Sequence, residues 1–293
     1  MSTTETNQSH FITNYFMGGI SGSLSKTLMA PFERSSLIFR FQLSNPSPPY
    51  TSTWDCMRRI IKEEGATYLW RGNIHNARSI FPTQALNFAF RDFFTHKIQP
   101  ASTTFSSSLI QYMMVGGLSG ACATCFTYPS FYTVRRGPID MSRMNLPKQP
   151  LISRLISDLK YRYKGFGGAL PYVVTYRALY FGLYDATMRE ILQEKKDGLG
   201  LLGLRFGVAY GSTLMAHLLS IPFHIVPFRM NIQEEQTRKY RNSWHCLSRI
   251  IKEEGIGAVF KGGFRGVTSV TSALILVLYD QLKDILNDIS KHN

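Results

Sequence analysis

Two cysteines have the spacing most readily associated with metal binding. Cys122 and Cys125 form a C-x-x-C motif, which is found in zinc sites. The motif lies in an apolar helical stretch without a nearby histidine or a second cysteine pair, so we predict no metal site. Cys56 and Cys246 occupy matching positions in two repeats, as small packing residues do. The sequence also offers no nucleophile–base pair, and we predict neither an enzyme nor a cofactor.

Acids, prolines and a longer cassette recur along the chain at similar spacing. Residues 54–72 (WDCMRRIIKEEGATYLWRG) and 244–262 (WHCLSRIIKEEGIGAVFKG) are copies, and a worn third copy ends at Tyr163-Lys164-Gly165. The same spacing relates Pro31, Pro129 and Pro222, and also Asp92, Asp185 and Asp280, each next to an aromatic residue. Self-similarity at a long period is the signature of repeat architecture. We therefore predict one domain, 1–293, built from unit one (11–98), unit two (109–193) and unit three (200–289).

The charge balance limits the class of partner. A net charge of +14 suits nucleic acid, anionic lipid or anionic small molecules. The basic residues are spread over all three units, and nothing resembles a nucleic-acid-binding module. We therefore do not predict nucleic-acid binding.

Several segments indicate membrane helices despite a mean hydropathy of -0.09. No apolar run reaches the ~18 uninterrupted residues of a simple transmembrane span. Segments 77–90, 109–134, 169–184 and 266–282 nonetheless carry almost no charge and are rich in small residues. Small residues let membrane helices approach closely, and polar ones face the bundle interior. The alternative is a set of soluble core helices, which the abundant Gly and Pro disfavour.

Each unit is predicted to contain a long helix, a loop, a short amphipathic helix and a second long helix. In unit one these are residues 11–43, kinked at Pro31, then 54–64, then a helix from 73 to about 97. Trp54, Met57, Ile60 and Ile61 are predicted on one face of the short helix. The other long helices are expected at 109–136, 168–193, 200–233 and 265–289. Six spans place both termini on one side, and residues 1–10 do not resemble a targeting peptide.

A sequence signature carries a family resemblance. Glu64-Gly65 with Trp70-Arg71-Gly72, and Glu254-Gly255 with Phe260-Lys261-Gly262, both read acidic-Gly-x4-aromatic-basic-Gly. With three repeats and a proline in the first helix of each, the chain resembles the mitochondrial carrier family, and within it the ADP/ATP carriers. Segments 25–34, 81–90, 176–182 and 277–280 carry the narrower resemblance. It implies an all-α membrane fold of six transmembrane helices in three pseudo-threefold repeats, with short amphipathic helices on the matrix side.

The resemblance also implies a location and a mechanism. The location is the mitochondrial inner membrane, with both termini towards the intermembrane space. A central nucleotide cavity is closed alternately by charged gates on the matrix and cytosolic sides.

The matrix gate of the family has an acid two residues after each proline and a base three residues further on. Of these six positions only Glu33 keeps its charge, and the other five are Ser36, Phe131, Val134, His224 and Pro227. Arg135, Arg136 and Arg229 lie nearby but out of helical phase.

The cytosolic gate of the family has three acids, each followed by a base three residues later. Asp92, Asp185, Asp280 and Lys283 remain, while Thr95 and Met188 replace two of the bases. We expect the pair Asp280–Lys283 to be complete and the other two acids to lie near water, because an unpaired buried carboxylate is costly.

The substrate positions implied by the resemblance are also altered. Lys26, Arg78, Tyr176 and Arg177 are candidate contacts if the chain transports. Ser79 replaces a phosphate-binding arginine, Tyr172 replaces a glycine beside the adenine pocket, and Thr268 or Ser269 replaces a basic contact. A polyanion needs several convergent cations, so we do not predict exchange of ADP for ATP.

The helix starts implied to bind lipid are retained. Free amides at a helix start suit phosphate, and in the family such sites bind cardiolipin. The alternative is an ordinary helix start after a turn. The candidate residues are Arg71, Gly72 and Asn73, then Lys164 and Gly165, then Lys261 and Gly262.

Two functions remain open. The first is a non-transporting accessory subunit of a respiratory-chain or other inner-membrane complex, with docking surfaces around residues 11–15 and 109–113. The second is an active exchanger of adenine nucleotide or another anionic metabolite, using Lys26, Arg78, Arg177 and His217. Membrane lipid, including cardiolipin, is the expected partner in both cases.

Overall fold

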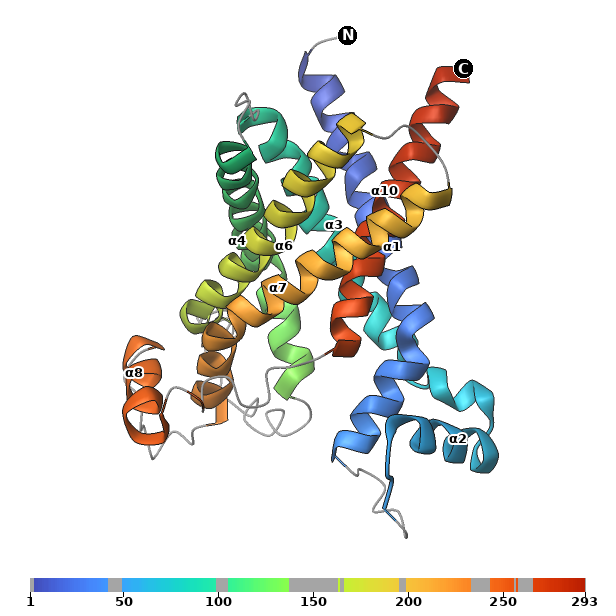
Figure 1. Cartoon of the computed structure of the whole chain (residues 1–293), viewed down its shortest axis with the longest axis vertical. Helices are drawn as coiled ribbons and strands as arrows, with labels where there is room; N and C mark the ends of the chain where they lie inside the picture. Colours follow the sequence, from blue (N-terminus) through green and yellow to red (C-terminus); the bar gives the residue numbers. More distant parts are fainter. Residues whose placement is uncertain are drawn as a thin grey trace, which may run out of the picture.

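The chain folds as a bundle of long helices. The computed structural model describes residues 3–41, 49–98, 105–136, 163, 166–194, 199–232, 243–255, 257 and 266–292, and no strand occurs in these ranges. The long helices there are α1 (Thr3–Phe41), α3 (Asn73–Ile98), α4 (Phe105–Arg136), α6 (Phe166–Glu194), α7 (Leu199–Ile232) and α10 (Gly266–His292) (Figure 1). The all-α prediction is confirmed. Helix α1 begins well before the predicted start at residue 11, because residues 3–10 contain no Gly or Pro to interrupt it.

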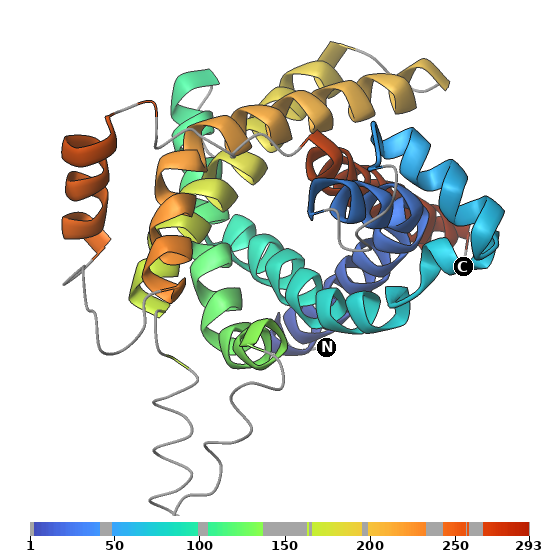
Figure 2. The same ribbon diagram turned by 90° about the horizontal axis from the view of Figure 1, so that it is seen from below.

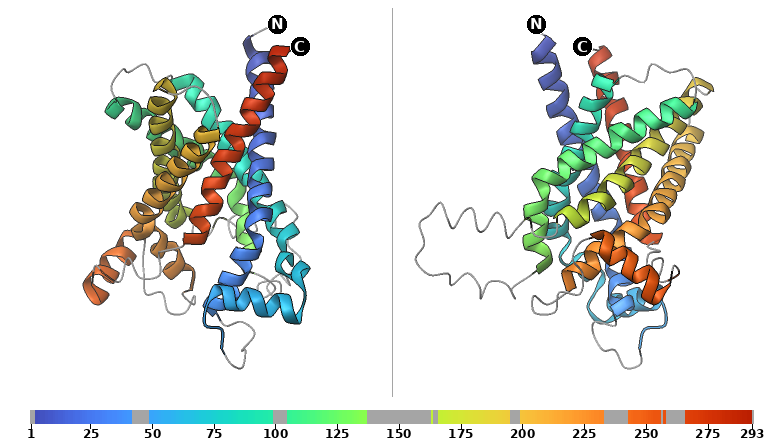
Figure 3. Two further views of the ribbon diagram at one scale, coloured as in Figure 1. Left: turned by 45° about the vertical axis from the view of Figure 1, so that its right-hand side comes forward. Right: turned by 90° about the vertical axis from the view of Figure 1, so that its left-hand side faces the viewer.

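The long helices form a closed ring in chain order. Helix α1 contacts α3, α3 contacts α4, α4 contacts α6, α6 contacts α7, α7 contacts α10, and α10 returns to α1 (Figure 2). Each predicted unit thus contributes one helix pair. Helix α1 begins and α10 ends at the same end of the bundle, which we call the termini side (Figure 3).

Short helices mark the opposite end, which we call the loop side. They are α2 (Thr53–Glu63), the 3-10 helix η1 (Ala66–Trp70) and α8 (Ser243–Glu254) (Figure 1). In α2, Met57 and Ile60 are buried as predicted, but Trp54 and Ile61 are 61% and 44% exposed, so the predicted single apolar face is wrong for these two. Both lie at the edge of the covered face, where the Trp54 ring makes an edge contact with Phe32 of α1.

Buried hydroxyl groups lower the hydropathy of the long helices, so most of them do not stand out as membrane spans in a hydropathy scan. Segments Phe105–Pro129 and Gly200–His224 are long and apolar enough, by length and composition, to cross a membrane. Elsewhere the helices bury serines that donate to carbonyl oxygens of their own helix, as Ser21 does to Gly18 and Ser25 to Ser21. A satisfied hydroxyl can be buried at low cost.

Glycines bring the helices of units one and two into backbone contact. A Cβ atom on Gly18 would lie 2.8 Å from the carbonyl oxygen of Gln84 in α3, and one on Gly116 would lie 2.5 Å from the carbonyl oxygen of Arg177 in α6. Only a residue without a side chain fits at these distances. Both glycines begin the same motif, Gly-Gly-x-Ser-Gly, at residues 18–22 and 116–120, and the predicted use of small residues for close helix packing is confirmed here.

Two aromatic side chains cap the proline kinks. A proline has no N–H to donate to the carbonyl four residues earlier, so Pro31 and Pro129 leave the carbonyls of Thr27 and Cys125 without a helical donor. The Trp70 Nε1 donates to the Thr27 oxygen at 2.9 Å, and the Tyr163 hydroxyl donates to the Cys125 oxygen at 2.5 Å. Both aromatics occupy the same place in the repeated signature. The matching residue of unit three is Phe260, whose side chain has no polar hydrogen.

Candidate functional site

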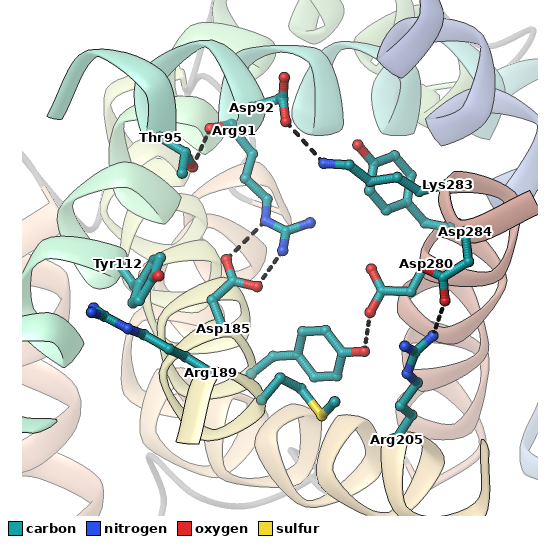
Figure 4. Close-up of a pocket in the computed structure, with 13 residues that line it drawn as sticks. Arg91, Asp92, Thr95, Tyr112, Asp185, Arg189, Arg205, Asp280, Lys283 and Asp284 are labelled. Carbon is teal, nitrogen blue, oxygen red and sulfur yellow. Dashed lines mark hydrogen bonds and ion pairs between the residues drawn. The ribbon is translucent and has the colours of Figure 1, made fainter. Parts of the chain in front are cut away.

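A charged cavity of about 320 Å³ lies among the second halves of α3, α6 and α10, towards the termini side of the bundle. The side chains that line it are drawn in Figure 4. Five helices contribute to it, and its lining includes four carboxylates and four basic side chains. The lining residues are Arg91, Asp92, Thr95, Tyr112, Tyr184, Asp185, Met188, Arg189, Arg205, Tyr279, Asp280, Lys283 and Asp284. All four predicted cytosolic-gate residues are among them.

The residues that precede the three acids join the units in a ring, which we call the gate ring. Arg91 of α3 donates to both oxygens of Asp185 in α6, with Nε 2.9 Å from Oδ2 (Figure 4). The hydroxyl of Tyr184 in α6 donates to Asp280 in α10.

A buried asparagine closes the gate ring between units three and one. The hydroxyl of Tyr279 in α10 donates to Asn14 Oδ1 at 2.7 Å, and Asn14 Nδ2 donates to Asp92 at 2.7 Å. Asn14 lies in α1 and is only 4% exposed. Every unit is therefore bonded to the next one at this level.

Arg91 is the centre of the gate ring. Its guanidinium lies 5.0 Å from the ring centroid of Phe181, 5.7 Å from that of Phe88 and 5.8 Å from that of Tyr279. These rings come from α6, α3 and α10, so one cation contacts all three units. The Arg91 and Asp185 side chains are 15% and 10% exposed. Cation–π contacts and a two-bond ion pair both strengthen when water is excluded.

The expected pairing of the gate acids is corrected by this geometry. Lys283 Nζ bonds Asp92 of unit one at 3.2 Å, whereas Asp280 accepts from Tyr184. Asp185 was expected near water, yet it is buried against Arg91. Thr95 and Met188 stand where the family has bases. The base that compensates for their absence is Arg91, which stands one residue before Asp92 and bonds Asp185. The repeat alignment contains this signal, because Arg91, Tyr184 and Tyr279 occupy one position and are all hydrogen-bond donors.

The loop-side remnant Glu33 has a different environment. Both of its oxygens lie 2.8 Å from Lys26 Nζ, and Thr271 Oγ1 of α10 donates to Oε1 at 2.6 Å. Lys26 and Glu33 belong to the same helix and are 23% and 20% exposed. The ion pair therefore joins no two units. His224, at another gate position, contacts the ring of Tyr172. The side chains of Phe131, Val134, Arg135, Arg136, Pro227 and Arg229 lie outside the described residues.

Two of the predicted substrate residues, Tyr176 and Arg177, contact neighbouring side chains of the bundle. Tyr172, Tyr176 and Tyr180 of α6 stack in a ladder, with centroids 6.0 Å and 5.6 Å apart. Arg177 lies over Tyr180 at 5.4 Å, and its Nη2 donates to Gln84 of α3 at 3.3 Å.

The remaining substrate positions do not complete a cluster. Arg78 is exposed, and within the described residues no hydrogen bond or ion pair joins it to Lys26, Tyr176 or Arg177. Ser269 is buried, while the side chain of Thr268 lies outside the described residues.

The start of α3 brings two arginines together. Gly72 has φ +83°, a conformation that a residue with a side chain rarely adopts. Arg71 and Arg34 lie 4.8 Å and 5.4 Å from the ring centroid of Tyr68, and Arg34 donates to the Arg71 carbonyl. Asn73 Nδ2 donates to Thr27. The matching Lys164, Gly165, Lys261 and Gly262 lie outside the described residues.

A closed ring of long helices, whose units are joined at one end by ion pairs and hydrogen bonds, is the arrangement that the sequence resemblance implies. The profile of the family described as mitochondrial carrier protein matches residues 7–102 and 203–290, and this chain belongs to that family. The predicted family is thus confirmed, and the matched ranges correspond to units one and three.

Individual relatives give the narrower similarity. The chain is 35% identical to "ADP/ATP translocase 4" of Bos taurus over 286 residues, which cover 92% of this chain and 88% of the relative. It is 31% identical to "ADP,ATP carrier protein" of Parachlorella kessleri, covering 97% and 88%. It is 33% identical to "Mitochondrial substrate carrier family protein ancA" of Dictyostelium discoideum, covering 95% and 94%. The predicted similarity to ADP/ATP carriers is confirmed.

Proposed function

We propose that this chain is a non-transporting carrier body that rests in one conformation and serves as an accessory subunit of a complex in the mitochondrial inner membrane. The observation that carries this proposal is the difference between the two ends of the bundle. The gate ring joins all three units at the termini side, whereas the loop-side carboxylate Glu33 forms its ion pair within α1. Alternating access needs two states of similar free energy, each held by its own gate.

The candidate substrate cations Lys26 and Arg177 are already bonded to other side chains, which supports the same proposal. Lys26 is bonded to Glu33, and Arg177 is bonded to Gln84 and stacked on aromatic rings. A phosphate group would have to displace a charged partner of Lys26 before binding it. Each charge-assisted bond contributes about 1.5–3 kcal/mol, so two engaged cations weaken nucleotide binding substantially.

One face of α7 is suited to a partner helix in the membrane. A Cβ atom placed on Gly203, Gly207 or Gly211 would meet nothing within 4 Å, and all three glycines are exposed. Counted from the proline of each unit, the matching residues are large, exposed and apolar. They are Ile12, Phe16 and Ile20 in α1, and Ile110, Met114 and Leu118 in α4. Elsewhere in this bundle glycine serves helix-to-helix contact, so these three glycines support docking of another helix here.

The docking surfaces expected from the sequence are less suited to this role. Phe11 and Tyr15 lie against Phe90 and Phe81 of α3, at centroid distances of 5.7 Å and 6.2 Å. Met113 packs against Gly182 of α6. These three side chains pack within the bundle, whereas Ile12 and Ile110 of the same segments are exposed. We propose the α7 glycine face as the docking surface because its glycines leave room for a second helix.

We further propose that the chain binds cardiolipin and that both termini face the intermembrane space. Arg71, together with Arg34 at the amide-rich start of α3, supports the lipid site. Cardiolipin added in detergent should raise the melting temperature, because a ligand that binds only the folded state stabilises it. An equal rise with a zwitterionic lipid would contradict a specific site.

An active exchanger is the second candidate. The gate ring favours it, because a transport cycle needs a gate that can close, and this ring closes one side with residues other than the bases of the family. Two experiments decide between the candidates. Native electrophoresis in mild detergent should find the chain in a large assembly, and liposomes loaded with ADP should take up no labelled ATP. Uptake that Lys26→Ala abolishes, together with migration near monomer mass, would favour the exchanger.

A further inference from the structure

We infer that Arg91 is the lock of this carrier body, the positioning residue that keeps the termini side closed in the absence of any ligand. The inference rests on the proposed single-conformation function and assigns that property to one side chain. It starts from the position of Arg91 in the repeat. The equivalent residues of units two and three are Tyr184 and Tyr279, which are neutral donors. Arg91 alone brings a charge to this position.

The contacts of Arg91 cross both boundaries that unit one shares with the other units. Its two bonds to Asp185 join α3 to α6, and its cation–π contact with Tyr279 joins α3 to α10. The ring of Tyr279 also stacks on Phe88 with centroids 4.0 Å apart, and the guanidinium lies 5.8 Å and 5.7 Å from these two centroids. Separating the units at this level would break an ion pair and an aromatic contact at once. A lysine could not replace these contacts, because it lacks the planar fork that bonds two oxygens and stacks on rings.

The other cations of the cavity do not share this placement. Lys283 is 44% exposed, and water screens its bond to Asp92. Arg205 bonds Asp284 of α10, so it acts within unit three. Arg189 of α6 donates to Ser108 of α4, within unit two. Of these four cations, only Arg91 is both buried and bonded to a carboxylate of another unit.

Thiol accessibility tests the lock directly. Ser272 of α10 lies about 12 Å deeper than Asp280 along the helix, at 1.5 Å per residue, and thus below the gate ring. Ser272→Cys should resist a membrane-impermeant thiol reagent added from the termini side. Thr95→Cys, which lines the cavity, should react and so proves that the reagent arrives. Cys122 and Cys125 are replaced by serine in every variant.

Arg91→Gln should increase the labelling rate of Ser272→Cys by at least about tenfold, and Arg91→Lys by less. Arg189→Gln, an arginine of the same cavity, is the matched control and should change nothing. If Arg91→Gln fails to fold, the neutral pair Arg91→Gln with Asp185→Asn leaves no unpaired charge and should give the same opening. A folded Arg91 variant in which Ser272→Cys stays protected would overturn the lock. Transport by the unaltered protein in liposomes would instead overturn the proposed function, so the two failures are distinct.

Discussion

The two ends of this bundle use similar residue types for opposite purposes. At the termini side, Asp185, Asp280 and Asp92 each accept a bond from another unit, so the acids hold three units together. At the loop side, Glu33 is paired with Lys26 two helical turns away on the same helix. Among the described residues, only the Thr271 hydroxyl bonds it from another unit. The count of charged residues is therefore a poor guide to gating. What matters is whether a bond crosses the boundary between units.

This comparison predicts a large difference in stability between two carboxylate-to-amide changes. Asp185→Asn leaves the buried Arg91 guanidinium without its counter-charge, which should cost about 3–5 kcal/mol of unfolding free energy. Glu33→Gln removes a partly exposed pair and should cost about 1 kcal/mol or less. Thermal unfolding of both variants in one detergent measures the difference. Equal losses would show that the loop-side pair holds the bundle as firmly as the gate ring does.

A smaller effect should come from the kink caps, which hold the loop side without ionic bonds. Trp70→Phe keeps the ring but removes the donor to the Thr27 carbonyl, and it should destabilise the fold by about 1 kcal/mol. Trp54→Phe is the control, because this tryptophan is exposed and phenylalanine keeps its ring contact with Phe32, so the change should cost little. Unit three already has a phenylalanine, Phe260, at this position, and its ring has no hydrogen-bond donor. An unchanged melting temperature for Trp70→Phe would show that the bond from Trp70 to the Thr27 carbonyl does not stabilise the fold.

The smallest effect on the isolated protein should come from the outer face of α7. Gly207→Ile meets open space in the structure, so the free energy of unfolding should stay within about 0.5 kcal/mol of the unaltered value. The same change should release the chain from its complex on native electrophoresis. Met114→Ile, at the matching position of unit two, should leave both properties unchanged. A complex that survives Gly207→Ile would exclude this face as the docking surface.

Much of the fold follows from local patterns in the sequence. Prolines, the Gly-Gly-x-Ser-Gly motif and the repeated cassette specify kinks, close contacts and helix boundaries through interactions between near neighbours. The apolar pattern of α2 predicted one face that includes Trp54, but it could not predict how much of that face is covered, because the covering residues belong to other elements. The role of Arg91 depends on the relative phase of α3, α6 and α10, which no single helix encodes. Comparing the residue before each acid across the three units would have identified the gate ring.

The central claim, one conformation closed at the termini side, is tested most directly by a distance distribution across that end. Lys97→Cys in α3 and Glu190→Cys in α6 place spin labels on exposed positions of two units. Cys122 and Cys125 are replaced by serine, while Cys56 and Cys246 are buried, and burial raises the pKa of the Cys56 thiol, which keeps it unreactive. Pulsed electron resonance in lipid should give a single narrow distribution that ADP and ATP leave unchanged. A second, longer distance, or a shift on adding nucleotide, would contradict the account.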